Sequence, residues 1–164
     1  LRSPSLRLDT RAGQPILNEV QPAPHHQARS QFSQLMSRHP RWIERCGPIG
    51  VYNCCGHVWA SRRTAILENS EWAKIRNDDG YRELNGSETP CVGDLAVYYM
   101  TDSSNDRCYC HVGEVVSLMQ IAHTASSIPL VLSKMGSGGG EVLHQCYDFP
   151  SRSEFEIVFW TDRP

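Results

Sequence analysis

The second half of the chain consists of short apolar runs separated by polar or Gly- and Ser-containing segments. The runs are GDLAVYYM (93–100), HVGEVVSLM (111–119), IPLVLSKMG (128–136), EVLHQCYDF (141–149) and FEIVFW (155–160). Residues such as Val, Ile, Tyr and Phe favour strands, and turn formers bound each run. We therefore expect a mainly antiparallel sheet from residue 93 onward.

The first half of the chain places apolar residues at helical spacing. Phe32, Leu35 and Met36 fall on one face of a helix. Pro40 ends that helix, and WIERC (42–46) continues the apolar face beyond it. One or two short helices are therefore expected in this region.

A further helix is predicted to begin near Cys54 and to run through CCGHVWASRRTAILEN (54–69), because the preceding GPIGVYN (47–53) is rich in turn formers. A short helical segment follows in SEWAKIRNDDGYREL (70–84), where NDDG is a strong turn signal. Helices first and strands afterwards predict an α+β fold, in which the helix at Cys54 packs on one face of the sheet.

The length of 164 residues suits one domain preceded by an irregular leader. Residues 1–30 contain several prolines and little periodicity, so an extended proline-containing arm is expected there. His25 and His26 of this arm are expected to be exposed. The hydrolase-like domain described below would then occupy residues 31–164.

Charge and hydropathy argue against two classes of partner. Sixteen basic and eighteen acidic residues nearly cancel, and the basic residues are scattered apart from the pair Arg62 and Arg63. A nucleic-acid partner is therefore not expected, since such proteins carry a clustered basic face. No apolar run approaches the ~20 residues that a membrane-spanning helix needs, so no membrane span is expected either.

Seven cysteines stand at positions 46, 54, 55, 91, 108, 110 and 146. Because the number is odd, at least one thiol stays free unless it pairs between chains. Several lie in apolar surroundings such as PCVGDLAVYY, where a reduced cysteine behaves as a small buried hydrophobe. A mostly reduced protein is therefore expected.

Cys54 stands directly after a turn, at the predicted first turn of its helix. The amino end of a helix stabilises anions, so a thiol placed there can have its pKa lowered from ~8.5 toward neutrality. Asn53 has the side chain of an N-cap, and Gly56 would let a substrate backbone approach closely. The pattern predicts a reactive thiolate.

A thiolate nucleophile needs an imidazole that holds the ion pair and later protonates the leaving group. His111 fits best, because it opens the predicted strand HVGEVVSL. Its neighbour Val112 points to the opposite face, and Gly113 leaves room beside the ring. We therefore expect a strand-borne His111 opposite a helix-borne Cys54.

The order NCCGHVWA, GDLAVYY and HVGEVVS resembles the NlpC-type cell-wall cysteine peptidases and their CHAP relatives. The resemblance covers roughly residues 50 to 160 and implies a papain-like fold. It implies Cys54 as nucleophile and His111 as base, with Gly93, Asp94 and Leu95 as the strand-entry signature. It also implies a polar third residue that orients the imidazole through its far nitrogen. His144 is the first candidate for that role and Ser133 the second.

Other readings of these residues stay open. Cys55 is a rival nucleophile, although the next helical position turns by about 100° and aims elsewhere. His57 is interpreted as a capping or surface residue, and His123 as solvated. Cys108, Cys110 and His111 could ligate zinc with Cys91 or Cys146 as the fourth ligand, although the C-x-C-H spacing is a poor match to zinc knuckles.

The resemblance implies a hydrolase that cleaves a peptide or amide bond and needs no cofactor or metal. Peptidoglycan stem peptides or their fragments are the leading substrate, and a protein partner or inhibitor could occupy the active-site groove. The alternative is a non-catalytic or zinc-stabilised binding module on the same fold. The compartment stays open, with secretion or delivery to the cell wall as one option.

Overall fold

The computed structural model describes residues 5–20, 26–102, 106–124, 126–149 and 155–164. The helical elements in these ranges are α1 (Ala28–Arg38), α2 (Cys54–Trp59), α3 (Asn69–Asp78) and the 3-10 turn η1 (Cys146–Asp148). The strands are β1 (Ile43–Cys46), β2 (Arg82–Glu83), β3 (Leu95–Thr101), β4 (Arg107–Gln120), β5 (Ser127–Lys134), β6 (Glu141–Gln145) and β7 (Glu156–Thr161).

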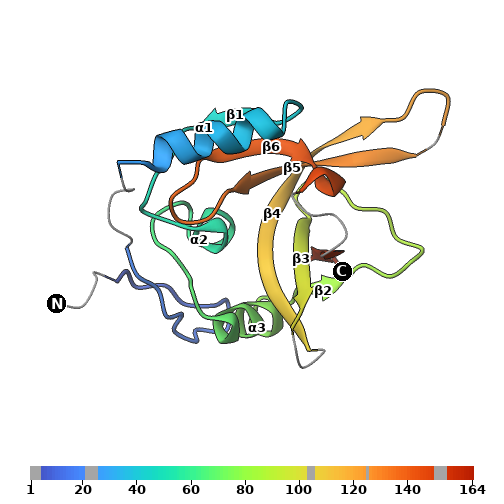
Figure 1. Cartoon of the computed structure of the whole chain (residues 1–164). Helices are drawn as coiled ribbons and strands as arrows, with labels where there is room; N and C mark the ends of the chain where they lie inside the picture. Colours follow the sequence, from blue (N-terminus) through green and yellow to red (C-terminus); the bar gives the residue numbers. More distant parts are fainter. Residues whose placement is uncertain (1–4, 21–25, 103–105, 125, 150–154) are drawn as a thin grey trace.

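The strands form one sheet in the order β1-β6-β5-β4-β3-β7-β2, with antiparallel pairing between all neighbours. The predicted α+β class with a mainly antiparallel sheet is therefore confirmed. Figure 1 shows α1 beside β1 and β6 at one end of the sheet, α3 at the other end, and α2 between them next to β4. The position of α2 places Cys54 against the middle of the sheet.

All five predicted apolar runs contain a strand, but the prediction of helix after Pro40 is wrong. Residues Ile43–Cys46 form β1, which pairs with β6 through Ile43 and Leu143. The apolar positions of WIERC fit a strand because β6 offers an unpaired edge, and hydrogen bonds along that edge outweigh the weak helical pattern.

Helix α2 is much shorter than predicted, because it ends at Trp59 and not near residue 69. The amides of Ala60 and Arg62 both turn back to the carbonyl of Gly56, and Ser61 and Arg62 have positive φ. The chain therefore reverses directly after one and a half turns. Gly56 is required at this reversal, since a Cβ there would lie 1.8 Å from the carbonyl oxygen of Thr64.

The described part of the N-terminal arm, residues 5–20, packs along α3. Ile16 is buried in the core, and the Leu17 amide donates to the Glu71 carboxylate at 3.0 Å. The side chain of Lys74 donates to the Pro15 carbonyl at 2.7 Å. Helix α1 begins at Ala28, within the segment expected to be an extended arm.

The buried residues lie on both faces of the sheet. One cluster sits between the sheet and α2 and α3, and contains Cys54, Trp72, Val97, Val112 and Trp160 among others. A second cluster on the opposite face contains Tyr98, Val115, Val131 and Cys146, with Phe149 and Phe155 against it. Successive side chains of β3 point to opposite faces of the sheet, so they belong to different clusters.

Among the described residues, none of the helices has the length and apolar character to cross a bilayer.

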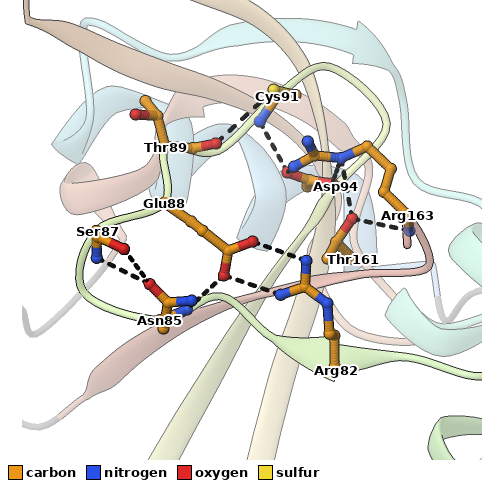
Figure 2. A network of polar contacts seen from close by, with 9 residues as sticks. All are labelled: Arg82, Asn85, Ser87, Glu88, Thr89, Cys91, Asp94, Thr161 and Arg163. Carbon is orange, nitrogen blue, oxygen red and sulfur yellow. Dashed lines mark hydrogen bonds and ion pairs between the residues drawn. The ribbon is translucent and has the colours of Figure 1, made fainter.

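The strand-entry residues Gly93 and Asp94 tie the last residues of the chain to β3. Gly93 has φ +95°, a conformation that favours glycine. The buried Asp94 carboxylate accepts from the Cys91 amide at 2.7 Å and from Arg163 at 3.1 and 2.7 Å. Figure 2 shows this carboxylate between the loop before β3 and the end of β7. Asp94 therefore has a structural role in holding the sheet entry.

Candidate active site

Cys54 is the first residue of α2, and the predicted N-cap is confirmed. The Asn53 side-chain oxygen accepts from the Gly56 amide at 2.9 Å. It also accepts from the Ile66 amide, while its NH₂ group donates to the Ile66 carbonyl at 2.7 Å. One side chain therefore fixes the start of α2 to the segment that follows the helix, and so fixes the backbone of Cys54.

His111 lies on β4 where this strand separates from β5. It pairs with Tyr98 of β3, whereas pairing with β5 begins only at Gly113 and Ser133. Helix α2 contacts both β4 and β5. Gly113 makes room for β5, because a Cβ on it would lie 2.3 Å from the Ser133 hydroxyl.

The thiol of Cys54 is buried, with 7% of the residue exposed, yet its pKa is lowered well below the ordinary value. The largest cause is the hydrogen bond from the Cys55 thiol, whose sulfur lies 3.9 Å away. Burial opposes this change, whereas the charge of His111, its hydrogen bond and the Val112 amide support it. Cys54 and His111 therefore interact. They approach from different sides, because Cys54 lies in the cluster under α2 whereas His111 packs against two rings of the cluster on the opposite face.

The pKa values of the two cysteines shift in opposite directions. Burial and the neighbouring Cys54 raise the pKa of Cys55 well above its ordinary value. These opposite pKa shifts favour Cys55 as the hydrogen-bond donor and Cys54 as the thiol that ionises first. Helix α2 has only six residues, so its dipole is a smaller influence than the predicted one. The causes that lower the pKa of Cys54 are its contacts with Cys55, His111 and the Val112 amide.

Two aromatic rings enclose the imidazole of His111. Phe149 stacks on it with ring centroids 4.4 Å apart and an angle of 25° between the planes. Tyr98 meets it edge-on at 5.4 Å. The Nε2 atom of His111 is buried and has no hydrogen-bond partner in the described part of the chain. The imidazole is therefore packed between aromatic rings, and its Nε2 atom has no polar contact there.

His144 and Ser133 hydrogen-bond to each other, with 3.0 Å between His144 Nε2 and the hydroxyl. The other ring nitrogen of His144 lies 2.8 Å from the Gln145 carbonyl. Burial lowers the pKa of His144 to about 4, so the ring is neutral at pH 7. The hydrogen bonds of His144 are thus directed away from His111, and its orienting role stays a prediction without a direct contact.

The interpretation of His57 as a capping or surface residue is wrong. His57 is buried, and its Nδ1 lies 3.1 Å from the Glu141 carboxylate of β6. Tyr52 and Arg62 donate to the same carboxylate. Burial lowers the pKa of His57, while the pKa of Glu141 is lowered by these donors against the effect of its own burial. This network clamps both ends of α2 to β6.

The residues considered for zinc do not converge. Cys110 directs its sulfur toward Met100 at 3.5 Å, and Cys108 directs its sulfur toward Asp102 at 3.7 Å. Within the described ranges no three His, Cys, Asp or Glu side chains are placed to hold one metal ion. All seven cysteines are free thiols.

His123 is exposed, as is His26, whereas His25 lies outside the described residues.

Comparison of the chain with protein-family models, with curated proteins and with solved structures finds no match. The interpretation of the site therefore rests on its own geometry and on the resemblance of its motifs.

Sequence reasoning missed two residues that shape the site. Phe149 follows η1 and carries no motif, so its stack on His111 arises from the path of the chain. Glu141 follows a glycine-rich turn and has no neighbour in the sequence that indicates three donors. The one available signal was the position of Glu141 at the start of a predicted strand. A carboxylate that becomes buried there requires hydrogen-bond partners.

Proposed function

We propose that the protein is a papain-like cysteine hydrolase, resembling NlpC and CHAP enzymes, that cleaves a peptide or amide bond. The observation that carries the proposal is the buried Cys54 thiol, whose pKa is lowered by the Cys55 thiol and by His111. A helix-borne cysteine against a strand-borne histidine on an antiparallel sheet supports the same function. Peptidoglycan stem peptides are the proposed substrate, by resemblance of motifs.

In the proposed reaction the Cys54 thiolate attacks the carbonyl carbon of the amide and forms a carbon–sulfur bond. The His111 imidazolium gives its proton to the leaving amine as the carbon–nitrogen bond breaks. A water molecule then attacks the thioester while neutral His111 takes a proton from it. This second step releases the carboxylic acid and returns the thiolate and imidazolium.

The first test is selective alkylation of the whole protein with iodoacetamide at pH 6 to 7, followed by peptide mapping. An activated Cys54 is expected to react much faster than the other six thiols, because only the thiolate is nucleophilic. Cys110 is an internal control. The residue is exposed to the reagent, but its thiol is partly desolvated by its neighbours, and this desolvation raises its pKa. Slow and uniform labelling would contradict the proposal.

The second test concerns the substrate. Purified cell-wall fragments are incubated with the unsubstituted protein and with Cys54→Ala, and the products are compared by mass spectrometry. New stem-peptide fragments are expected with the unsubstituted protein alone. Identical digests from the two proteins would rule out wall hydrolysis while leaving other amide substrates to be examined.

A binding module without catalysis is the second candidate, and the burial of the site favours it. Cys54 is only 7% exposed and His111 only 5%, so a substrate carbonyl reaches the sulfur only if neighbouring side chains move. A module of this kind would bind peptides equally well as the unsubstituted protein and as Cys54→Ala, and would release no product from either.

A further inference from the structure

The imidazole of His111 lacks the hydrogen bond that commonly fixes a catalytic histidine. In such sites one ring nitrogen faces the nucleophile, and a polar group holds the other nitrogen and so sets the ring orientation. Here Nε2 is buried without a partner among the described residues, and His144 and Ser133 hydrogen-bond to each other. The ring contacts of His111 are therefore a second means of fixing its orientation, beside any bond of its other nitrogen.

Phe149 packs against the imidazole and against two further rings. Its ring lies 4.7 Å from that of Tyr98 and 5.4 Å from that of Phe155, in addition to the 4.4 Å stack on His111. Tyr98 is itself fixed, because its hydroxyl donates to the Cys146 carbonyl at 3.0 Å. The turn that carries Phe149 and the strand that carries His111 are thus joined by packing of their aromatic rings with Tyr98.

We propose that Phe149 is a positioning residue for His111, and that its stacked ring does what a hydrogen-bonding third residue does in a triad. This inference rests on the proposed function. The stack restricts rotation of the imidazole, so the ring keeps one nitrogen toward Cys54.

The test compares Phe149→Leu and Phe149→Ala with Phe149→Tyr, which keeps the stack, and with Phe155→Leu as a matched control. Phe155 belongs to the same cluster and touches Phe149. The first readout is the pH midpoint of Cys54 alkylation by iodoacetamide in the full chain. Cys55, Cys110 and Lys134, the other ionisable side chains that interact with Cys54, are unchanged in every variant.

The midpoint is expected to rise by about one pH unit in Phe149→Leu and Phe149→Ala, the size of effect that a displaced neighbouring charge produces. It is expected to stay unchanged in Phe149→Tyr and Phe155→Leu. A general loss of packing would move the Phe155→Leu midpoint as well. Thermal unfolding shows whether each variant is folded. If Phe149→Ala does not fold, the midpoint of the milder Phe149→Leu decides whether Phe149 positions His111.

The second readout is the nitrogen NMR signals of His111 at a pH where the ring is neutral. One tautomer, with well-separated signals, is expected in the unsubstituted protein and averaged signals in Phe149→Leu. Unchanged signals and an unchanged midpoint in a folded Phe149→Leu would overturn the inference. An ordinary thiol midpoint in the unsubstituted protein would instead contradict the proposed function, and the NMR signals would still decide the role of Phe149.

Discussion

Cys54 and Cys55 are adjacent buried residues whose sulfur atoms lie 3.9 Å apart. The hydrogen bond between them is the largest influence that lowers the pKa of Cys54, ahead of His111. Under the proposed function, Cys55 therefore has a supporting role and Cys54 is the nucleophile.

Replacing Cys55 with alanine is expected to shift the pH midpoint of Cys54 alkylation upward by about one unit, because the thiolate loses its hydrogen-bond donor. Cys55→Ser retains a hydroxyl donor and is expected to keep or lower the midpoint. The rate of iodoacetamide incorporation at Cys54 across pH 5 to 9 measures both. Equal midpoints in the alanine and serine variants would contradict the assigned role of Cys55.

The neutral, buried His144 makes stability depend on pH. Its pKa in the folded protein is about 4, compared with an ordinary value of about 6.5. The unfolded chain therefore binds more protons between these values, so the stabilisation is complete above about pH 6.5 and is lost as the pH falls toward 4. The loss is expected to reach about 2 to 3 kcal/mol.

Urea unfolding at a series of pH values measures this dependence, with His144→Gln as the matched variant. The glutamine side chain can still hydrogen-bond to Ser133 but does not titrate. Its free energy of unfolding is expected to change less between pH 7 and pH 4.5 than that of the unsubstituted protein. An equal change in both proteins would exclude His144 as the source.

Helix α2 is held to β6 mainly through the Glu141 carboxylate, which accepts from Tyr52 and Arg62 and lies 3.1 Å from His57. Glu141→Ala leaves these groups without their shared acceptor. The free energy of unfolding is expected to fall by about 2 to 4 kcal/mol, and the fall is measured by urea unfolding. Glu44→Ala, which removes a more exposed carboxylate from β1, is the control and is expected to change little.

At the scale of elements, the sequence predicted the strands better than the helices. Five runs of strand-forming residues became β3 to β7, because their apolar side chains are buried on a sheet. β1 and β2 are short and take their conformation from their partners, so no local pattern identified them. The end of α2 was missed for a similar reason, since contact between Gly56 and the distant Thr64 backbone decides it.

For the whole molecule, the C-terminal residues are joined to the sheet entry by Asp94. Asp94→Ala is expected to lower the free energy of unfolding by about 1 to 3 kcal/mol, because the Cys91 amide loses its acceptor and Arg163 loses its partner. Arg82→Ala breaks the exposed pair with Glu88 in the same network of Figure 2. It is the control, with a much smaller expected effect. Similar effects of the two substitutions would contradict a special role for Asp94.

The arrangement of the candidate site is also a property of the whole molecule. The motifs around Cys54 and His111 indicated two of its residues, because their spacing matched a known order of helix and strand. Phe149 and Glu141 were missed because the tertiary fold brings them to the site, Glu141 at the start of β6 and Phe149 directly after η1. Packing across the sheet creates such contacts, and no periodicity along the chain records them.

The most direct test of the central claim is the pH–rate profile of Cys54 alkylation in the full chain, compared between the unsubstituted protein and His111→Gln. The account predicts a reactive thiolate below pH 7 in the first, and a midpoint raised by at least about one unit in the second, since the neighbouring charge is lost. Profiles that coincide, both with the midpoint of an ordinary thiol near 8.5, would contradict it.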